Sequence, residues 1–337
     1  MISTYFFYHK KFLIIILVLT LLCSQTYAQN WFNESFESRQ TITISNTGTT
    51  TLVNFPTYLN ITYDPSMQND FEDLRFTNGS CGSSSPSQLF YEIENYSLST
   101  NAHVWINIPS IPSSGTNICM YFNNSLATYS SNSFTWNSEY ESVWKFEEVG
   151  SSSARQDSTN NSYDAIPQNF DNDEKVQGRI GYGDNLDGSN DYLAIQSINY
   201  NSQSISELTA CSWFNTNFVG SSYNDNWAFL DFDRSEFFNV YIRGDNGAVS
   251  FSTNSGGIDD QDGTTTGLND GSWHYACAVY DGTDKIIYVN GVEDSRVTNA
   301  HSGANLGATS TRCGFIGDGS EATTFDGGRN DIYYEGS

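Results

Sequence analysis

The stretch SWHYACAVYDGTDKIIYVNGVED (Ser272–Asp294) decides the fold class of this chain. Residues 273–280 form a short run with apolar side chains at alternate positions, and residues 286–289 form a second apolar run. Runs of this kind indicate β-strands. Asn290-Gly291 follows the second run, and both residues tolerate the positive φ angles of a type I′ turn. The stretch therefore predicts two strands that lead into a tight hairpin.

The same alternation recurs in short runs along the chain. Examples are TITIS (Thr41–Ser45), HVWINI (His103–Ile108) and NICMYF (Asn117–Phe122). Clusters of Gly, Asn, Ser and Pro separate these runs, and almost no segment has a helical period. The pattern predicts an all-β protein built from antiparallel strands in sandwiches.

The N-terminus has the features of an export signal. Lys10 and Lys11 precede the apolar run FLIIILVLTLLC (Phe12–Cys23), and a small residue follows at Ala28. This order is typical of a secretory signal peptide, here residues 1–28. The run is shorter than the roughly 20 residues that span a bilayer. We therefore expect a secreted or cell-surface protein with no membrane insertion after removal of the signal.

The chain is strongly acidic, with 39 acidic residues against 14 lysines and arginines and a net charge of −25. Such a surface repels nucleic acids and anionic membranes, so neither is expected as a partner. A protein from a high-salt habitat and a secreted calcium-binding protein share this composition. The sequence leaves both explanations open.

A domain boundary is expected near residue 130. Five of the six prolines lie before it, whereas glycine becomes frequent after it. The segment ATYSSNSFTWNSEYES (Ala127–Ser142) is polar and rich in serine, as short linkers are. We predict a first module over residues 29–130, a linker over 131–142 and a second module over 143–337.

The cysteines suggest disulfides rather than a metal centre. None of them forms the CxxC pattern of zinc sites. In an exported protein some of them are expected to pair. The bond between Cys81 and Cys119 is favoured because both lie in the first half. The remaining cysteines after the signal are Cys211, Cys277 and Cys313, so the odd total leaves at least one thiol outside an intrachain bond.

The second half resembles a known family. The residues that carry the likeness are VWKFEE (Val143–Glu148), DSTNNSYDA (Asp157–Ala165), GRIGYGDNLDGSNDYLAI (Gly178–Ile195), LTACSWF (Leu208–Phe214), the opening stretch, and GFIGDGSEATTFDGGRNDIYY (Gly314–Tyr334). In this order they resemble a LamG-like jelly roll of the concanavalin A-like lectin/glucanase superfamily. The resemblance implies a β-sandwich over residues 143–337 in which Leu193 and Ile195 pack inward. Domains of this kind usually run beyond the position of Ser337, which suggests a shortened C-terminus.

The first half resembles the domain of unknown function 2341. The likeness rests on TITISNTG (Thr41–Gly48), DLRFTNG (Asp73–Gly79), YEIENY (Tyr91–Tyr96) and HVWINIPSIPSSGTNICMYFNN (His103–Asn124). This family is a secreted, β-rich module that often precedes LamG-like domains. The resemblance implies a second β-sandwich-like module but no biochemical activity.

Calcium is the cofactor that the composition suggests. The loop DSTNNSYD offers Asp157, Asn160, Asn161 and Asp164, and calcium takes six to eight oxygen ligands. The resemblance adds Asp331, because the first and last strands of LamG-like folds lie close together. The alternative is that these residues only make turns and keep the surface solvated.

A glycan is the ligand that the superfamily implies. Sugar sites combine an exposed aromatic ring with carboxylates and amides. The loop SSYNDNW (Ser221–Trp227) has this composition, with Tyr223, Asn224, Asp225 and Trp227 as candidate ligand-binding residues. The alternative, which the pattern favours, is that Trp227 anchors a core strand.

No motif predicts catalysis. The ExDxxE carboxylate pair of related glycoside hydrolases is absent, and so is the GxSxG nucleophile motif. EIEN (Glu92–Asn95) comes nearest and is better explained as alternating strand residues. We therefore expect a non-catalytic binding module that recognises a glycan or a surface protein in adhesion. A structural spacer and a hydrolase-related enzyme are the alternatives.

Overall fold

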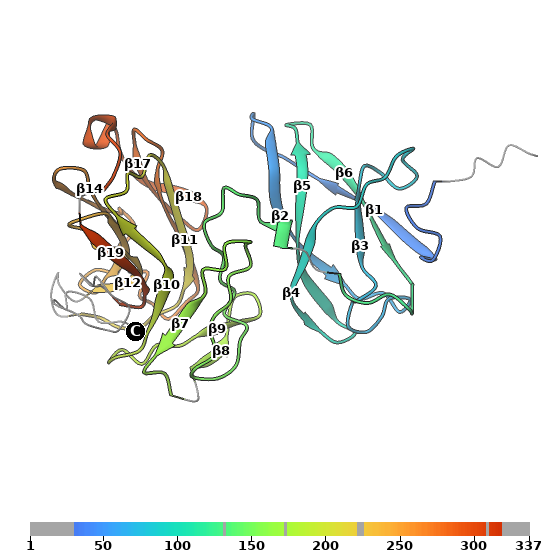
Figure 1. Cartoon of the computed structure of the whole chain (residues 1–337), viewed down its shortest axis with the longest axis horizontal. Coiled ribbons are helices and arrows are strands. Elements are labelled where there is room, and N and C mark those ends of the chain that lie inside the picture. The colour runs from blue at the N-terminus through green and yellow to red at the C-terminus, as the bar shows by residue number, and fades with distance from the viewer. Residues whose placement is uncertain (1–29, 131–132, 172–173, 221–225, 308–309, 319–337) are drawn as a thin grey trace, which may run out of the picture.

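The computed structural model describes residues 30–130, 133–171, 174–220, 226–307 and 310–318. Within these ranges the chain consists of β-strands and two short 3-10 helices, η1 (Ser133–Thr135) and η2 (Ala300–Gly303), with no α-helix. The strands form two modules, an N-terminal one drawn in blue to teal and a larger one drawn in green to red (Figure 1). The all-β class predicted from the sequence is confirmed.

The N-terminal module packs two three-stranded antiparallel sheets against each other. One sheet has the order β1-β6-β3 and the other the order β2-β5-β4. The strand bounds are β1 Ser38–Ile44, β2 Leu52–Thr62, β3 Arg75–Asn78, β4 Tyr91–Ser97, β5 Asn101–Ile111 and β6 Thr116–Phe122.

Strand β5 shows how the alternating sequence builds this module. Ala102, Val104 and Ile106 are fully buried in the core between the two sheets. His103 and Trp105, which alternate with them, point to the opposite face and are partly exposed. The sheet β2-β5-β4 therefore presents a second face, outside the core, to the rest of the chain.

The C-terminal module is a jelly-roll sandwich with a seven-stranded and a four-stranded antiparallel sheet. Their orders are β15-β14-β13-β12-β19-β10-β7 and β11-β16-β17-β18, and β8 pairs with β9 as a separate hairpin. The bounds are β7 Ala165–Gln168, β8 Lys175–Gln177, β9 Tyr182–Asp184, β10 Tyr192–Asn201, β11 Leu208–Phe214, β12 Asn226–Asp231, β13 Phe238–Arg243, β14 Val249–Asn254, β15 Ile258–Asp262, β16 His274–Tyr280, β17 Lys285–Val289, β18 Val292–Val297 and β19 Thr311–Ile316.

The two local predictions made for this module are confirmed. Strands β16 and β17 pair in an antiparallel register, and Asn290 and Gly291 have φ angles of 51° and 81° in the turn after β17. In the stretch LDGSNDYLAI, the Asp187 carboxylate accepts hydrogen bonds from the backbone N–H groups that follow it. Strand β10 then buries Leu193 and Ile195 almost completely, so this stretch is architectural.

Each module contains one disulfide. Cys81 bonds to Cys119, as predicted from the sequence. Cys211 bonds to Cys277 across β11 and β16, where the two residues are direct register partners; the sequence did not identify this pair. Cys313 is buried in β19. Two disulfides are consistent with an extracellular protein.

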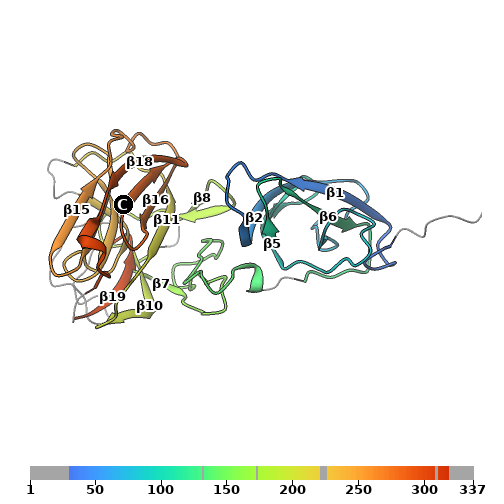
Figure 2. The same cartoon turned by 90° about the horizontal axis from the view of Figure 1, so that it is seen from above.

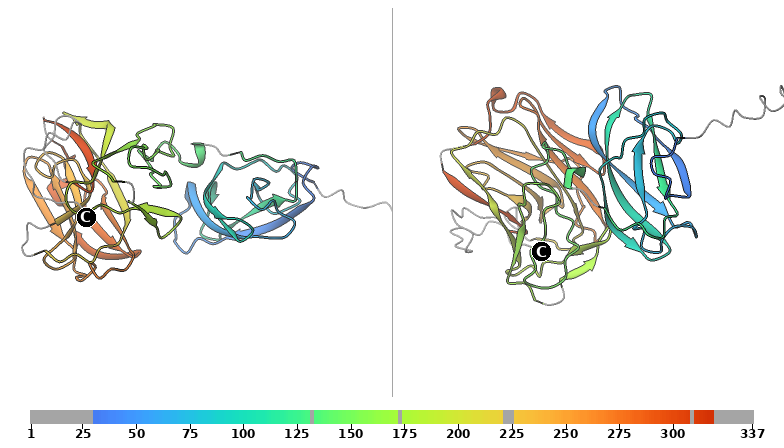
Figure 3. Two further views of the ribbon diagram at one scale, coloured as in Figure 1. Left: turned by 90° about the horizontal axis from the view of Figure 1, so that it is seen from below. Right: turned by 45° about the vertical axis from the view of Figure 1, so that its right-hand side comes forward.

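The four-stranded sheet lies on the side of the jelly roll that faces the N-terminal module. Strands β11 and β18 lie toward that module, whereas β15 lies on the far side (Figures 1 and 2). The β8–β9 hairpin and the segment after η1 lie between the modules, as two further views also show (Figure 3). Among the described residues, no helix is long and apolar enough to cross a membrane.

Candidate functional site

The predicted ligand loop is only partly described. Tyr223, Asn224 and Asp225 lie outside the described residues. Trp227 lies in β12, is 5% exposed, and packs edge-on against Phe218 with 4.2 Å between ring centroids. Its indole belongs to the core of the jelly roll, which is the alternative role that the sequence favoured.

In the predicted calcium loop, Asp157 organises the backbone. Its Oδ1 accepts hydrogen bonds from the N–H groups of Val143 and Thr159, both at 2.9 Å. Its Oδ2 accepts from the Thr159 hydroxyl at 2.6 Å and from the Tyr163 N–H at 3.0 Å. Four donors point at the two oxygens where a cation would have to bind. The arrangement suits a carboxylate-centred turn better than a calcium site.

The other predicted ligands that the structure describes have hydrogen-bond partners of their own or face solvent. Asp164 accepts a hydrogen bond from the Asp157 N–H at 2.9 Å. The Asn161 amide donates to the carbonyls of Tyr140 and Glu141, and Asn160 is exposed. Asp331 lies outside the described residues. Within the described ranges, no group of three or more His, Cys, Asp or Glu side chains is arranged to hold a metal ion.

We expect the stability of the protein to be independent of calcium. Millimolar calcium and a chelator should give the same melting temperature. Asp157→Ala should lower the free energy of unfolding by about 2 to 3 kcal/mol in both, because it leaves partly buried donors without an acceptor. A calcium-dependent rise in melting temperature that Asp157→Ala abolishes would instead establish the metal site.

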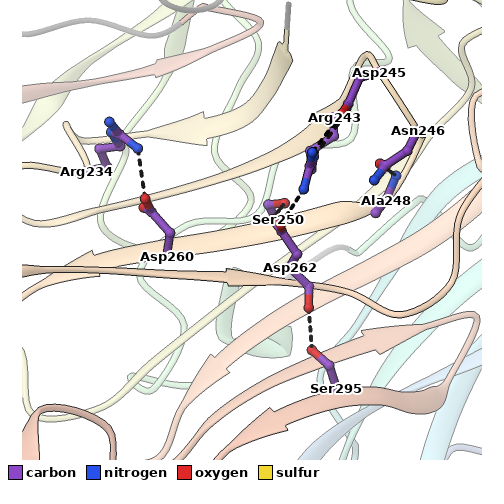
Figure 4. A network of polar contacts seen from close by, with 9 residues as sticks. All are labelled: Arg234, Arg243, Asp245, Asn246, Ala248, Ser250, Asp260, Asp262 and Ser295. Atoms are coloured by element: carbon purple, nitrogen blue, oxygen red, sulfur yellow. Dashed lines mark hydrogen bonds and ion pairs between the residues drawn. The ribbon is translucent and has the colours of Figure 1, made fainter. Parts of the chain in front are cut away.

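A polar network covers the edge of the seven-stranded sheet (Figure 4). Arg243 forms ion pairs with Asp245, at 2.7 Å, and with Asp262. The Ser250 hydroxyl also donates to Asp262, and Arg234 pairs with Asp260 at 3.0 Å. Each of these carboxylates already has a cationic or hydroxyl partner, so the network stabilises the sheet edge and offers little to a ligand.

The outer face of the sheet β2-β5-β4 carries an aromatic row. Tyr58, a register partner of Trp105, stacks on His103, and its hydroxyl hydrogen-bonds to His103 Nδ1 at 2.5 Å. The Trp105 ring contacts Trp136, with 5.1 Å between centroids, and Trp136 contacts Tyr140 at the same distance. These rings lie where the N-terminal module meets the jelly roll.

Glu92 and Glu94 stand beside this row on β4, where the register with β5 shifts between Ile93 and Asn95. The Trp136 indole N–H donates to Glu92 Oε2 at 2.9 Å, and the Trp105 indole N–H donates to Glu94 Oε2. Burial raises the pKa of Glu94, and the hydrogen bond from Trp105 and the charge of Lys145 partly offset this rise.

The jelly roll contributes the opposite wall of the junction. Lys145 forms an ion pair with Glu92, and the Ser158 hydroxyl donates to the same carboxylate at 3.2 Å. Glu147 accepts a hydrogen bond from the Asn95 amide at 2.7 Å. These contacts connect β4 directly to the first residues of the second module.

A cavity of about 430 Å³ lies between these two walls. We call it the junction cavity. It is lined by Glu92, Ile93, Glu94, Tyr129, Lys145, Glu147, Glu148, Gln156, Asp157 and Ser158. Carboxylates therefore dominate its lining, and residues of both modules are needed to form it.

Elsewhere at the junction, the jelly roll presents an exposed tryptophan next to a partly buried tyrosine. Trp213 is 41% exposed and lies 5.1 Å from Tyr275, measured between ring centroids. The Arg179 guanidinium lies over the Trp213 ring at 5.5 Å. Burial and the charge of Glu94 raise the pKa of Tyr58, whereas Arg179 lowers it. Arg179 therefore influences groups of both modules.

Sequence reasoning missed the junction as a site. The alternation in EIEN and HVWINI correctly places Glu92, Glu94 and Trp105 on strands, but it does not show which face meets another module. The aromatic residues at Trp136 and Tyr140, within an otherwise polar linker, were the available signal. A linker that needs only to be flexible does not require such large apolar side chains.

The fold and this junction define a two-module β protein whose second module is a jelly-roll sandwich. Residues 187–331 match the family model of the concanavalin A-like lectin/glucanases superfamily, and residues 70–148 match that of a domain of unknown function, DUF2341. The C-terminal module is thus a domain of the concanavalin A-like lectin/glucanases superfamily, preceded by a DUF2341 module. None of the curated proteins matches the chain.

Several solved structures are similar to parts of the chain. The binding domain of Paraclostridial Mosquitocidal Protein 1 has 15% identity over 48% of this chain and 44% of its own, with a TM-score of 0.37. A SAP-like pentraxin from Limulus polyphemus has 16% identity over 40% and 60%, with a TM-score of 0.29. A putative carbohydrate binding protein from Bacteroides ovatus has 13% identity over 83% and 69%, with a TM-score of 0.28. The matched part spans less than two thirds of the first two structures.

Proposed function

We propose that this chain is a non-catalytic, extracellular glycan-binding protein whose recognition surface lies at the junction of its two modules. In this proposal, residues 29–130 form the first module, residues 131–142 the linker and residues 143–337 the jelly roll. The recognition surface then lies where the linker brings the two modules together. Its biological role would be attachment to a saccharide-bearing surface.

One observation carries this proposal: the junction combines an exposed tryptophan with carboxylates around a cavity. Trp213 offers an aromatic face on which the apolar side of a sugar ring can stack. Glu94 and Glu148 line the cavity and offer acceptors for hydroxyl groups. A pure spacer has no need for an exposed tryptophan and an acidic cavity at the same junction.

The state of Glu92 supports binding rather than hydrolysis. A retaining glycosidase needs one carboxylate that is free to attack the sugar and a second that donates a proton. Both oxygens of Glu92 are engaged, Oε1 by Lys145 and Ser158 and Oε2 by Trp136. Neither oxygen of Glu92 is left free to act as a nucleophile. For the proposed non-catalytic protein, incubation with the bound glycan is expected to release no new reducing ends.

A glycan array followed by titration of the full chain tests the proposal. Trp213→Ala should weaken binding about tenfold, since loss of a stacking contact worth about 1.4 kcal/mol corresponds to that factor. Phe90→Ala is the matched control, because Phe90 is 46% exposed but stacks on Phe134 instead. Absence of any glycan binding would favour the spacer, and equal losses in both variants would remove Trp213 from the site.

A further inference from the structure

We propose that the junction cavity binds the ammonium group of an amino sugar, with Glu94 and Glu148 as its acceptors. This inference rests on the proposed glycan-binding function and names the class of saccharide. Glu94 lies on β4 of the N-terminal sandwich, whereas Glu148 follows residues that pack against the jelly-roll core, so both sandwiches would contribute to the site.

The charges around the cavity leave a negative excess. Its lining contains the carboxylates of Glu92, Glu94, Glu147, Glu148 and Asp157, and the single cation Lys145. Lys145 already forms an ion pair with Glu92, and its side chain is 10% exposed. The other carboxylates have no cation of their own among the lining residues.

Hydrogen-bond partners separate the occupied carboxylates from the available ones. Glu147 accepts from the Tyr182 N–H at 3.0 Å and from the Asn95 amide at 2.7 Å, so each of its oxygens has a donor. Asp157 accepts from four donors of its own module. Glu147 and Asp157 therefore support the loop structure.

Glu94 and Glu148 each keep one oxygen without a donor among the described residues. Glu94 Oε2 accepts from Trp105, and no such donor reaches Oε1. Glu148 Oε1 accepts from the Gln156 N–H at 3.1 Å. Glu148 Oε2 also lacks a described donor, but it has almost no exposed surface, so an ammonium group reaches it only if the side chain turns toward the cavity. A buried acceptor with no donor is unusual in a folded protein and indicates that a partner is missing.

An ammonium group suits carboxylate oxygens that lack hydrogen-bond donors better than other sugar substituents do. It carries three donors and a positive charge, whereas a hydroxyl has one donor and no charge. Hydrogen bonds between an ammonium group and a carboxylate are shorter and stronger than neutral ones. Carboxylated or sulfated saccharides would be repelled by the same lining. Burial is the main cause of the raised pKa of Glu94, and the charges of Glu147 and Glu92 add to the rise.

Calorimetric titration of the full chain at pH 6 with three oligosaccharides tests this inference. The probes are β-1,4-linked oligomers of glucosamine, of N-acetylglucosamine and of glucose, equal in length. The glucosamine oligomer should bind at least tenfold more tightly than the other two. Glu94→Gln and Glu148→Gln should each remove about tenfold of this preference, while Glu34→Gln, an exposed glutamate elsewhere on the N-terminal module, should leave it unchanged.

The outcomes distinguish this inference from the proposed function. Equal binding of all three oligomers, with no effect of the two glutamine variants, would overturn the amino-sugar inference and leave glycan binding intact. A preference that persists in both variants and disappears in 0.3 M salt would also overturn it, since general attraction to an acidic protein would then explain it. Binding of no saccharide on the array or in the titrations would remove the proposed function itself. Circular dichroism of each variant checks the fold.

Discussion

Asp184→Asn is expected to lower the free energy of unfolding of the jelly roll by about 3 to 5 kcal/mol. Asp184 accepts two hydrogen bonds from the Arg155 guanidinium, from Nε at 2.7 Å and from Nη2 at 3.0 Å. Both side chains are almost fully buried, with exposures of 2% for Arg155 and 5% for Asp184. The variant would leave the arginine charged and buried without its counter-ion, and urea denaturation measures the loss.

Asp245→Asn provides the comparison for this variant. Asp245 also pairs with an arginine, Arg243, at 2.7 Å, but its side chain is 31% exposed. Exposed ion pairs contribute little, so this variant should change stability by less than about 1 kcal/mol. A similar small loss for Asp184→Asn would show that the Arg155–Asp184 pair does not stabilise the fold as argued. Replacing both partners by apolar residues should recover much of the loss.

Lys285→Met is expected to change how stability depends on pH. Lys285 is fully buried in β17, and its ammonium group donates to the Asp259 carbonyl at 2.5 Å. Burial lowers the pKa of Lys285 from 10.5 to about 8, although Asp259 partly offsets this effect. Between pH 8 and 10.5 the unfolded chain therefore binds more protons than the folded one at this site. The contribution of this lysine to stability rises with pH in that window, by about 3 kcal/mol in total.

The difference between wild type and variant isolates this contribution. Tyrosines also titrate in alkaline solution, and burial raises the pKa of Tyr91 to about 12, but both proteins share these groups. Denaturation curves between pH 7 and 10 should show the wild type gaining stability relative to Lys285→Met as the pH rises. Parallel pH profiles would mean that the Lys285 amine keeps its ordinary pKa in the folded protein.

The features predicted correctly from sequence are those that local chemistry determines. Asn290-Gly291 specifies a turn through its tolerance of positive φ, and the alternation around Val104 and Ile106 specifies a strand with one buried face. The bond between Cys211 and Cys277 was not predicted, because it depends on the register of β11 and β16. The two cysteines are 66 residues apart in the sequence. Pairings over that distance are set by tertiary packing, which the sequence pattern does not record.

The candidate site was predicted less well for the same reason. Glu92 and Glu94 lie on a strand, as predicted, although a register shift between Ile93 and Asn95 interrupts the alternation. The groups opposite them begin some fifty positions later, at Lys145 and Glu147. Trp227 has the composition of a sugar-stacking residue in its loop, yet its ring fills the core. Residue type indicates what a side chain can do, whereas packing decides whether the side chain is available.

A co-crystal structure of residues 29–337 with a glucosamine oligomer is the most direct measurement of the central claim. The account predicts a sugar amine in the junction cavity, within hydrogen-bonding distance of Glu94 on β4 and of Glu148. A saccharide bound elsewhere, such as over the polar network of Arg243 and Asp262, with the junction cavity filled only by water, would contradict it.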